Sequence, residues 1–253
     1  MKTMDLNCDM GESFGTYKLG YDEQAMPHVT SINVACGFHA SDPVNMVKTV
    51  KLAKQYGVAI GAHPSYPDLV GFGRRVLMAS PAEIKADVMY QVGALAGICK
   101  SEGLTLQHVK AHGALYNQAA KDLAVGKAIA EALAAIDKNL IMVCLANSLM
   151  VTAAKEVGIP YVEEAFADRA YTAEGQLVPR KQEGSVVHDV HEVAKRVLQM
   201  VKDGTVQTID GKTIPINAQT VCVHGDTPSA VEMIQKITEI FAAEQVTLQA
   251  FGK

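Results

Sequence analysis

The architecture is clearest in TSINVACGFHASDPVNMVKTVKLAKQYGVAIGA (30–62). Its two ends, 30–36 and 57–62, are short runs of the β type, rich in Val and Ile. The segment between them opens with Asp42 as a helix cap and Pro43 at the first helical position. Strand, helix and strand in this order predict two parallel strands joined by a crossover helix.

The same alternation continues on both sides of this unit. We predict further strands at 3–9, 105–111, 139–145, 160–165 and 219–223. We predict helices at 42–56, 80–103, 122–137, 188–204 and 227–244. Because no Gly-rich dinucleotide fingerprint is present, seven strands favour an α/β fold with a seven-stranded parallel β/α barrel, TIM-like but incomplete, over a doubly wound sheet.

Two features complete the predicted domain organisation. Asp210-Gly211 in TVQTIDGKTIPI (205–216) lies between two β-branched runs and predicts a β-hairpin inserted before the last strand. No linker, low-complexity tract or fixed-period repeat interrupts the chain, so we predict a single domain over 1–253.

The composition excludes several classes of partner. A formal net charge of −4 leaves no basic footprint for nucleic acid or an anionic membrane. No apolar run approaches the roughly 18 residues that a membrane span needs, and the N-terminus lacks the apolar segment of a signal peptide. The five cysteines have neither CxxC nor zinc-finger spacing, which indicates reduced thiols. We therefore expect a cytoplasmic protein that binds neither nucleic acid nor membrane.

The first predicted strand has an unusual polar face. Asp5, Asn7 and Asp9 alternate with apolar residues, so a period of two places all three on one side. Acidic groups inside a barrel are costly unless they are solvated, paired or bound to a cation. Glu12 follows shortly afterwards. Chemistry in barrels collects at the carboxyl ends of the strands, so this strand end is a candidate site.

Other strand ends are similar. His108, Lys110 and His112 share one face of the fourth predicted strand, and four more strands run into His- or Asp-containing strings: CGFHASD (36–42), AHPSYPD (62–68), FADRAY (166–171) and HGDTP (224–228). Each feature also has a plain structural interpretation, in which a His is a hydrogen-bonded filler and Asp42 or Asp226 is a helix cap. The repetition at six strand ends favours a catalytic site over that interpretation.

Motifs outside the strand ends narrow the chemistry further. GFGRR (71–75) is either an anion cradle or an ordinary exposed loop. The sequence has no GxSxG elbow and no HExxH motif. Gly211-Lys212-Thr213 imitates the end of a P-loop, but it lies in the predicted hairpin, and Val206 stands where the first Gly is required. The sequence therefore predicts no Walker-type ATP site.

Six strings of this sequence carry a family resemblance. They are LNCDMGESFG (6–15), INVACGFHASDP (32–43), GAHPSYPDLVGFGRR (61–75), VKAHGALYN (109–117), EAFADRAY (164–171) and VHGDTP (223–228). Together they resemble the LamB/YcsF family, the A subunit of bacterial ATP-dependent 5-oxoprolinase, in order from residue 4 to about 250. The resemblance implies ATP-dependent hydrolysis of 5-oxo-L-proline to L-glutamate together with separate B and C subunits. It also implies a barrel similar to the polysaccharide deacetylase-like superfamily.

The resemblance suggests roles for the strand-end residues. We expect Asp9 to act as general base or metal ligand, with Lys110 and His112 beside it as charge stabiliser and acid. His39 and His63 would complete the pocket. The expected substrate-binding residues are Asn7, Glu12, Arg74, Asp168, Arg169, His224 and Asp226, with Arg74 or Arg169 holding a carboxylate or phosphate.

Cofactors are less constrained. Asp9, His63 and His112 resemble the Asp-His-His triad of the deacetylase-like proteins, and one carboxylate with two imidazoles suits a divalent metal ion. Lys110, on the same face, argues against a metal because an ammonium group repels a dication. ATP is expected as a co-substrate that the partner subunits handle, because no P-loop is present.

Two alternatives stay open. The first is a metal-dependent deacetylase of a small carbohydrate-like substrate, which would act without ATP. The second is a non-catalytic partner that only binds substrate or scaffolds the other subunits. A scaffold has no need of Asp, His and Lys at several strand ends, so the sequence favours an enzyme.

Overall fold

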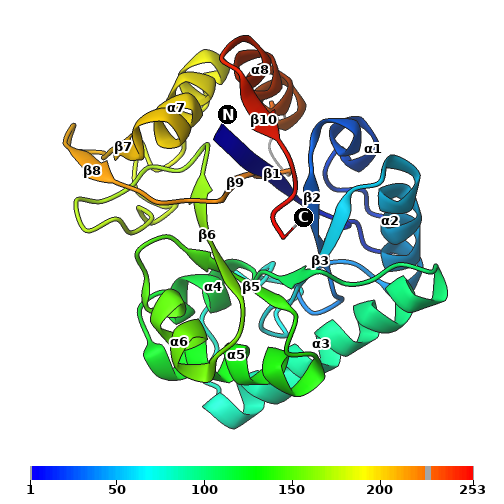
Figure 1. Ribbon diagram of the computed structural model, residues 1–253. Coiled ribbons are helices and arrows are strands. Elements are labelled where there is room, and N and C mark those ends of the chain that lie inside the picture. The colour runs from blue at the N-terminus through cyan, green and yellow to red at the C-terminus, as the bar shows by residue number, and fades with distance from the viewer. Residues whose placement is uncertain (1, 226–228, 253) are drawn as a thin grey trace.

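Seven parallel strands form a closed barrel at the centre of the computed structural model, which describes residues 2–225 and 229–252 (Figure 1). They are β1 (Lys2–Met10), β2 (Ser31–Ala35), β3 (Ala59–His63), β4 (His108–Val109), β5 (Ile141–Leu145), β6 (Tyr161–Phe166) and β9 (Thr220–Val223). Each strand pairs with the next in this order, and β9 pairs back with β1. The predicted seven-stranded β/α barrel is confirmed, and its ring is closed.

Helices surround the barrel (Figure 1). They are α1 (Asp22–Ala25), the 3-10 turn η1 (Met26–His28), α2 (Pro43–Tyr56), α3 (Pro81–Ser101), α4 (Gly113–Ala119), α5 (Leu123–Ile136), α6 (Leu149–Val157), α7 (Val190–Asp203) and α8 (Ala230–Ala243). The helix N-caps predicted from the sequence form in the structure. The Asp42 side chain accepts hydrogen bonds from the first turn of α2, and Ser80 with Glu83 forms a capping box on α3.

The hairpin predicted before the last barrel strand is confirmed as β7 (Thr205–Gln207) and β8 (Thr213–Pro215), which pair antiparallel. The helices α1, α4 and α6, the turn η1 and a short strand, β10 (Val246–Leu248), were not predicted. β10 pairs in parallel with the first residues of β1. The predicted strand at 105–111 is regular only at β4, although the Lys110 and His112 N–H groups still bond to carbonyls of the β3 segment.

The apolar core lies between the barrel and its helices. Leu6 and Cys8 on β1 are fully buried in this core, whereas Asn7 and Asp9 on the same strand bond to side chains of other barrel strands. A period of two therefore separates an apolar outer face from a polar interior. None of the helices in the described residues has the length and apolarity needed to cross a bilayer.

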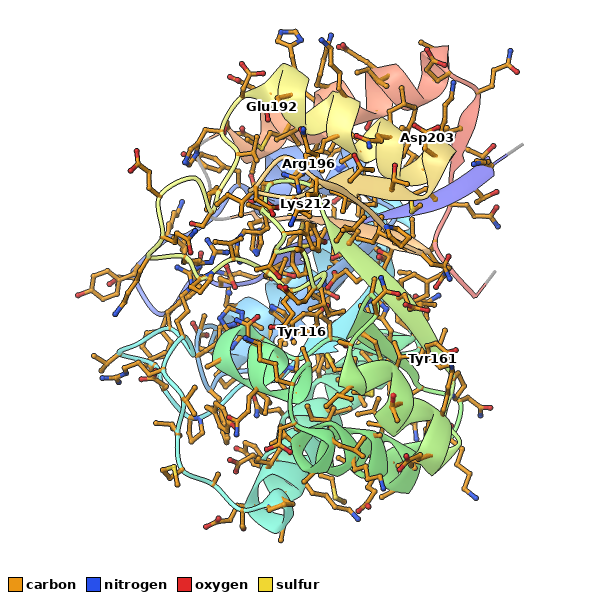
Figure 2. All side chains as sticks on the ribbon, turned by 90° about the vertical axis from the view of Figure 1, so that its left-hand side faces the viewer. Tyr116, Tyr161, Glu192, Arg196, Asp203 and Lys212 are labelled. Atoms are coloured by element: carbon orange, nitrogen blue, oxygen red, sulfur yellow. The ribbon has the colours of Figure 1, made fainter. Side chains whose placement is uncertain are left out.

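Helix α7 anchors the segment that follows β6. Arg196 lies on the inner side of this helix, whereas Glu192 and Asp203 are exposed (Figure 2). The Arg196 Nη2 atom donates a hydrogen bond of 2.7 Å to the backbone carbonyl of Arg169. This contact fixes the start of the chain segment that forms one wall of the site.

Candidate active site

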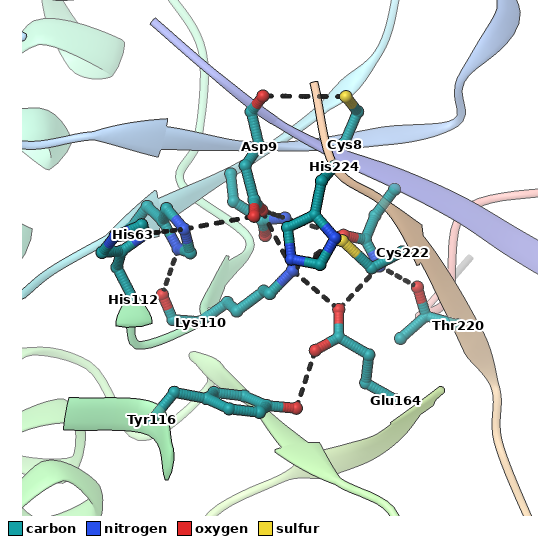
Figure 3. Close-up of polar contacts among 12 residues, drawn as sticks. Cys8, Asp9, His63, Lys110, His112, Tyr116, Glu164, Thr220, Cys222 and His224 are labelled. Atoms are coloured by element: carbon teal, nitrogen blue, oxygen red, sulfur yellow. Dashed lines mark hydrogen bonds and ion pairs between the residues drawn. The ribbon is translucent and has the colours of Figure 1, made fainter. Parts of the chain in front are cut away.

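Lys110 lies at the centre of a polar network inside the barrel (Figure 3). Its Nζ atom is 2.9 Å from Oε1 of Glu164 and 3.0 Å from Oδ1 of Asp9. Asn7 Oδ1 and Cys222 Sγ lie 3.3 and 3.0 Å from the same nitrogen. Burial disfavours the ammonium form, but the Asp9 carboxylate and its neighbours hold the pKa of Lys110 well above its usual range. Lys110 is therefore a permanent buried cation.

Asp9 stands between this network and a group of histidines. Its Oδ1 atom also accepts a hydrogen bond of 2.9 Å from Asn33, and its Oδ2 atom is 3.4 Å from Nε2 of His63. Burial alone would raise the pKa of the Asp9 carboxyl, but His63 and Lys110 outweigh it and lower this pKa well below its usual range. Asp9 is thus a carboxylate on the wall of a cavity.

Glu164 on β6 is a member of the network that the sequence analysis missed. It is fully buried, accepting a 2.7 Å hydrogen bond from the Tyr116 hydroxyl and a 3.0 Å bond from Asn7 Nδ2. A signal was present, because adjacent Glu163 and Glu164 in a strand point to opposite faces and one of them has to enter the barrel. Tyr116 was missed because it lies on the unpredicted α4.

Three histidines and a glutamate form a second cluster, next to Asp9. His63 Nε2 lies 3.0 Å from His112 Nδ1, and the rings of His39 and His112 stack with centroids 3.8 Å apart. Glu12 Oε1 lies 3.5 Å from His39 Nε2 and 3.9 Å from His112 Nδ1. Burial lowers the pKa of both His39 and His112 well below the usual range, so these two rings are neutral.

The cluster differs from the predicted metal triad. One ligand atom each from Glu12, His39, His63 and His112 lies within 4.8 Å of the others, so these four residues can hold a metal ion. The predicted triad shares His63 and His112 with this set. Its third member, Asp9, is bonded to Lys110 and Asn33 through Oδ1, whereas its Oδ2 lies 3.4 Å from His63 Nε2. The predicted triad stays a prediction.

The GFGRR loop acts neither as a backbone anion cradle nor as a plain exposed loop. The N–H groups of residues 71–74 all donate to the loop itself or to Asp68 and Leu69. Phe72 has a φ of 54° and accepts a 2.8 Å hydrogen bond from His112 Nε2 through its carbonyl. The loop therefore supports the histidine cluster.

A cavity of about 930 Å³ opens above both clusters. The predicted residues on its wall are Asp9, Glu12, His63, Arg74, Lys110, His112, Arg169 and His224. Further basic groups on the wall are Lys121, Arg180 and Lys181. This charge favours an anionic ligand.

Other predicted site residues lie behind the wall. Asn7 is 1% exposed and belongs to the Lys110 network, where it positions Glu164. Asp168 accepts hydrogen bonds of 2.9 Å from His224 Nδ1 at both carboxylate oxygens, which orients the His224 ring beside Phe166. Asp226 lies outside the described residues.

Arg169 holds the segment that covers one side of the cavity. Its Nη2 atom donates to the carbonyl of Val178 at 2.5 Å, and its Nε atom donates to the carbonyl of Ser185 at 3.3 Å. Burial lowers the pKa of Arg169 to about 10. Its predicted contact with a substrate carboxylate or phosphate stays a prediction, beside this observed structural role.

Comparison with known proteins bears on this site. Residues 4–253 match the LamB/YcsF family. The chain belongs to the LamB/YcsF family. The resemblance inferred from six strings is thereby confirmed over almost the whole sequence.

Relatives within the LamB/YcsF family are similar along their full length. A protein from Clostridium beijerinckii, named as the A subunit of 5-oxoprolinase, is 50% identical over 248 residues, covering 98% of this chain and 97% of its own. Another of that name, from Pyrococcus abyssi, is 51% identical and covers 96% and 95%. The crystal structure of a lactam utilization protein from Thermus thermophilus is 45% identical, with a TM-score of 0.94 over 98% of this chain and 100% of that one.

Proposed function

We propose that this chain is the A subunit of an ATP-dependent 5-oxoprolinase, which hydrolyses 5-oxo-L-proline to L-glutamate. The observation that carries the proposal is the full-length identity of about half with relatives that bear the name of this 5-oxoprolinase component. The site supports it, because a buried carboxylate and ammonium pair meets a cavity with basic walls. A small anionic lactam matches such a site in charge, and the cavity is large enough to admit it.

Ring opening needs an activated carbonyl, because an amide is a poor electrophile. Transfer of the ATP γ-phosphoryl group to the lactam oxygen forms an O–P bond and breaks the bond between that phosphorus and ADP. Water then adds to the ring carbon and gives up one proton. The C–N bond breaks, and the nitrogen takes up protons to become the α-ammonium group, which leaves a γ-glutamyl phosphate. A second water hydrolyses this acyl phosphate to the γ-carboxylate of L-glutamate and inorganic phosphate.

The barrel residues suit the hydrolytic steps of this reaction. Asp9 is ionised and faces the cavity, so it can orient the attacking water and accept its proton. Its low pKa makes it a weak base, which suffices only against an activated electrophile. Lys110 stays cationic beside it and stabilises negative charge that develops on the substrate oxygen. Arg74, whose guanidinium carbon lies 4.8 Å from the centre of the Phe72 ring, would hold the substrate carboxylate.

ATP is proposed to reach this site together with partner subunits. The names of the relatives designate one lettered component of a larger enzyme, which is consistent with B and C subunits completing it. Gly211-Lys212-Thr213 lies in the β7–β8 hairpin, away from any strand-to-helix turn that a P-loop requires. Calorimetry with this chain alone should detect no ATP binding, and tight binding would move the nucleotide site into the barrel.

The proposal is tested by glutamate formation from 5-oxoproline. This chain is mixed with its B and C subunits, with and without ATP, and compared with the Asp9→Asn variant. We expect ATP-dependent glutamate formation that falls at least about 100-fold in Asp9→Asn, the scale of a lost general base. Asp203→Asn, an exposed change at the end of α7, is the matched control and should retain full activity.

Two results would redirect the proposal. Near-normal turnover by a folded Asp9→Asn variant would remove Asp9 from the chemistry. Absence of glutamate from the folded wild-type mixture, with release of acetate from acetylated sugars in the absence of ATP, would replace the proposal by the deacetylase alternative.

A further inference from the structure

Two histidines of the second cluster have their tautomers fixed by backbone carbonyls. His63 Nδ1 lies 2.7 Å from the carbonyl oxygen of Lys110, and His112 Nε2 lies 2.8 Å from the carbonyl oxygen of Phe72. A carbonyl only accepts, so each of these ring nitrogens has to carry the hydrogen. In the neutral form of each ring, the opposite nitrogens, His63 Nε2 and His112 Nδ1, carry lone pairs that can coordinate a cation.

These two lone-pair nitrogens face each other. They are 3.0 Å apart, which is hydrogen-bonding distance, and Asp9 Oδ2 lies 3.4 Å from the same His63 nitrogen. Two lone-pair nitrogens at this distance repel each other, so the contact requires either a proton on one of them or a metal cation beside both. The Glu12 carboxylate, 3.9 Å from His112 Nδ1, adds negative charge at the same point.

His39 gives a separate indication. It is 0% exposed, and among the described residues no hydrogen bond reaches either of its ring nitrogens. A buried imidazole without a partner loses its hydration without compensation. Its Nε2 atom lies 3.5 Å from Glu12 Oε1. A ring nitrogen of His39 therefore lies within 4.8 Å of ligand atoms of Glu12, His63 and His112.

We propose that Glu12, His39, His63 and His112 form a binding site for one divalent transition-metal cation of the zinc type. Three imidazole nitrogens and one carboxylate oxygen are ligands that such a cation prefers. Bonds of about 2.1 Å in a tetrahedron separate neighbouring ligand atoms by about 3.4 Å. Three of the six separations, at 3.0, 3.5 and 3.9 Å, bracket this value, and all six are within 4.8 Å.

The surroundings suit a cation as well. The hydrogen bonds from His63 and His112 to backbone carbonyls are the outer contacts that orient metal-bound imidazoles. The objection from Lys110 is removed, because its ammonium is paired with two carboxylates, Asp9 and Glu164. Lys110, Asp9 and Glu164 together therefore carry a net negative charge beside the histidine cluster.

Metal content and cobalt spectroscopy test the site without any activity measurement. The full-length chain, freed of metal with a chelator, is titrated with Zn²⁺ and with Co²⁺ at neutral pH. We expect one ion per chain, visible d–d bands for the Co²⁺ form, and a higher unfolding temperature when the ion is bound. His39→Gln and His112→Gln should each weaken Zn²⁺ binding at least about 100-fold, more than the loss expected for an outer contact.

His191→Gln, an exposed change on α7, is the control and should bind like the wild type. If a variant does not fold, the wild-type stoichiometry and Co²⁺ bands still decide the question. Less than a tenth of an ion per wild-type chain, or unchanged affinity in folded His39→Gln, would overturn the site and leave a shared proton between His63 and His112. Metal binding without glutamate formation would retain the site while refuting the proposed function.

Discussion

The Nζ atom of Lys110, the residue after β4, lies 2.9 Å from Oε1 of Glu164 on β6, and β5 separates the two strands in the barrel. Both side chains are buried, and the glutamate is held from its other oxygen by Tyr116. The contact joins, through the barrel interior, two parts of the wall that are one strand apart. The contact fixes the position of the Lys110 ammonium group, which also pairs with Asp9.

Replacing Lys110 should destabilise the protein, because its ammonium group neutralises two buried carboxylates. Lys110→Met leaves Asp9 and Glu164 as unpaired buried carboxylates and is expected to lower the free energy of unfolding by about 3–5 kcal/mol. Urea unfolding measures this change. The double variant Lys110→Met/Glu164→Gln removes one of the two orphaned charges and should regain part of the loss. Equal free energies of unfolding for both variants and the wild type would show that the two carboxylates do not need Lys110 to neutralise them.

Gly73 should tolerate no side chain. Its φ is +62°, and an added Cβ would lie 2.2 Å from Ser65 Oγ and 2.8 Å from His112 Cδ2. We expect Gly73→Ala to lower the free energy of unfolding by about 1–3 kcal/mol and to weaken Zn²⁺ binding. Gly97→Ala in α3 meets no atom within 4 Å and should instead stabilise the protein by about 0.5–1 kcal/mol. Thermal unfolding of both variants checks the opposite signs, and a stable Gly73→Ala would contradict the close packing.

Asp5 should make stability depend on pH. Burial raises its pKa to about 6, even though Thr220, Thr30 and Ser31 donate hydrogen bonds to it. Between pH 4 and 6 the folded state therefore keeps a proton that the unfolded state has released. The contribution of Asp5 to the free energy of unfolding is fully present below pH 4. It is lost as the pH rises through 6, by about 3 kcal/mol for a pKa difference of two units.

The Asp5→Asn variant isolates this effect from other titrating groups. The stability of the wild type relative to Asp5→Asn should fall by that amount as the pH is raised from 4 to 6. Urea unfolding at several pH values measures the difference. A difference that stays constant over this range would show that Asp5 is ionised in the folded protein.

Arg169 should control opening of the cavity wall. Without its hydrogen bonds to the carbonyls of Val178 and Ser185, Arg169→Met is expected to loosen the intervening segment. Charged hydrogen bonds contribute about 1.5–3 kcal/mol each, so tryptic cleavage at Arg180 or Lys181 should accelerate about tenfold or more. Lys195→Met, exposed on α7, is the control. Unchanged cleavage of Arg169→Met would mean that backbone contacts alone hold the segment.

Much of this site was predictable from local patterns. Period-two alternation assigned Asp9 and Lys110 to inward faces, and strand ends in a parallel barrel lie at one rim, so their meeting follows from the fold class. The alternation also contained Glu164, which a strand-end search passes over because it lies inside a strand.

Other features depend on tertiary contacts that no short stretch contains. The pairing of Glu164 with Lys110 requires the register of two intervening strand pairs. β10 has only three residues, and the N-cap residue of α4, His112, makes no side-chain capping hydrogen bond, so neither has a strong local signal. The inclusion of Glu12 and His39 in the histidine cluster depends on how the loops after β1 and β2 fold over the rim.

The pairing of β1 with β9 also has a consequence for synthesis on the ribosome. Thr220 donates a hydrogen bond to Asp5, 215 positions earlier in the chain, and Lys110 donates one to the thiol sulfur of Cys222. A nascent chain that lacks β9 leaves β1 and β6 with unpaired edges and the interior charges incompletely enclosed. The N-terminal strand, translated first, must therefore wait for nearly the whole polypeptide before its buried carboxylates are enclosed, and during that interval the chain is a natural client for chaperones.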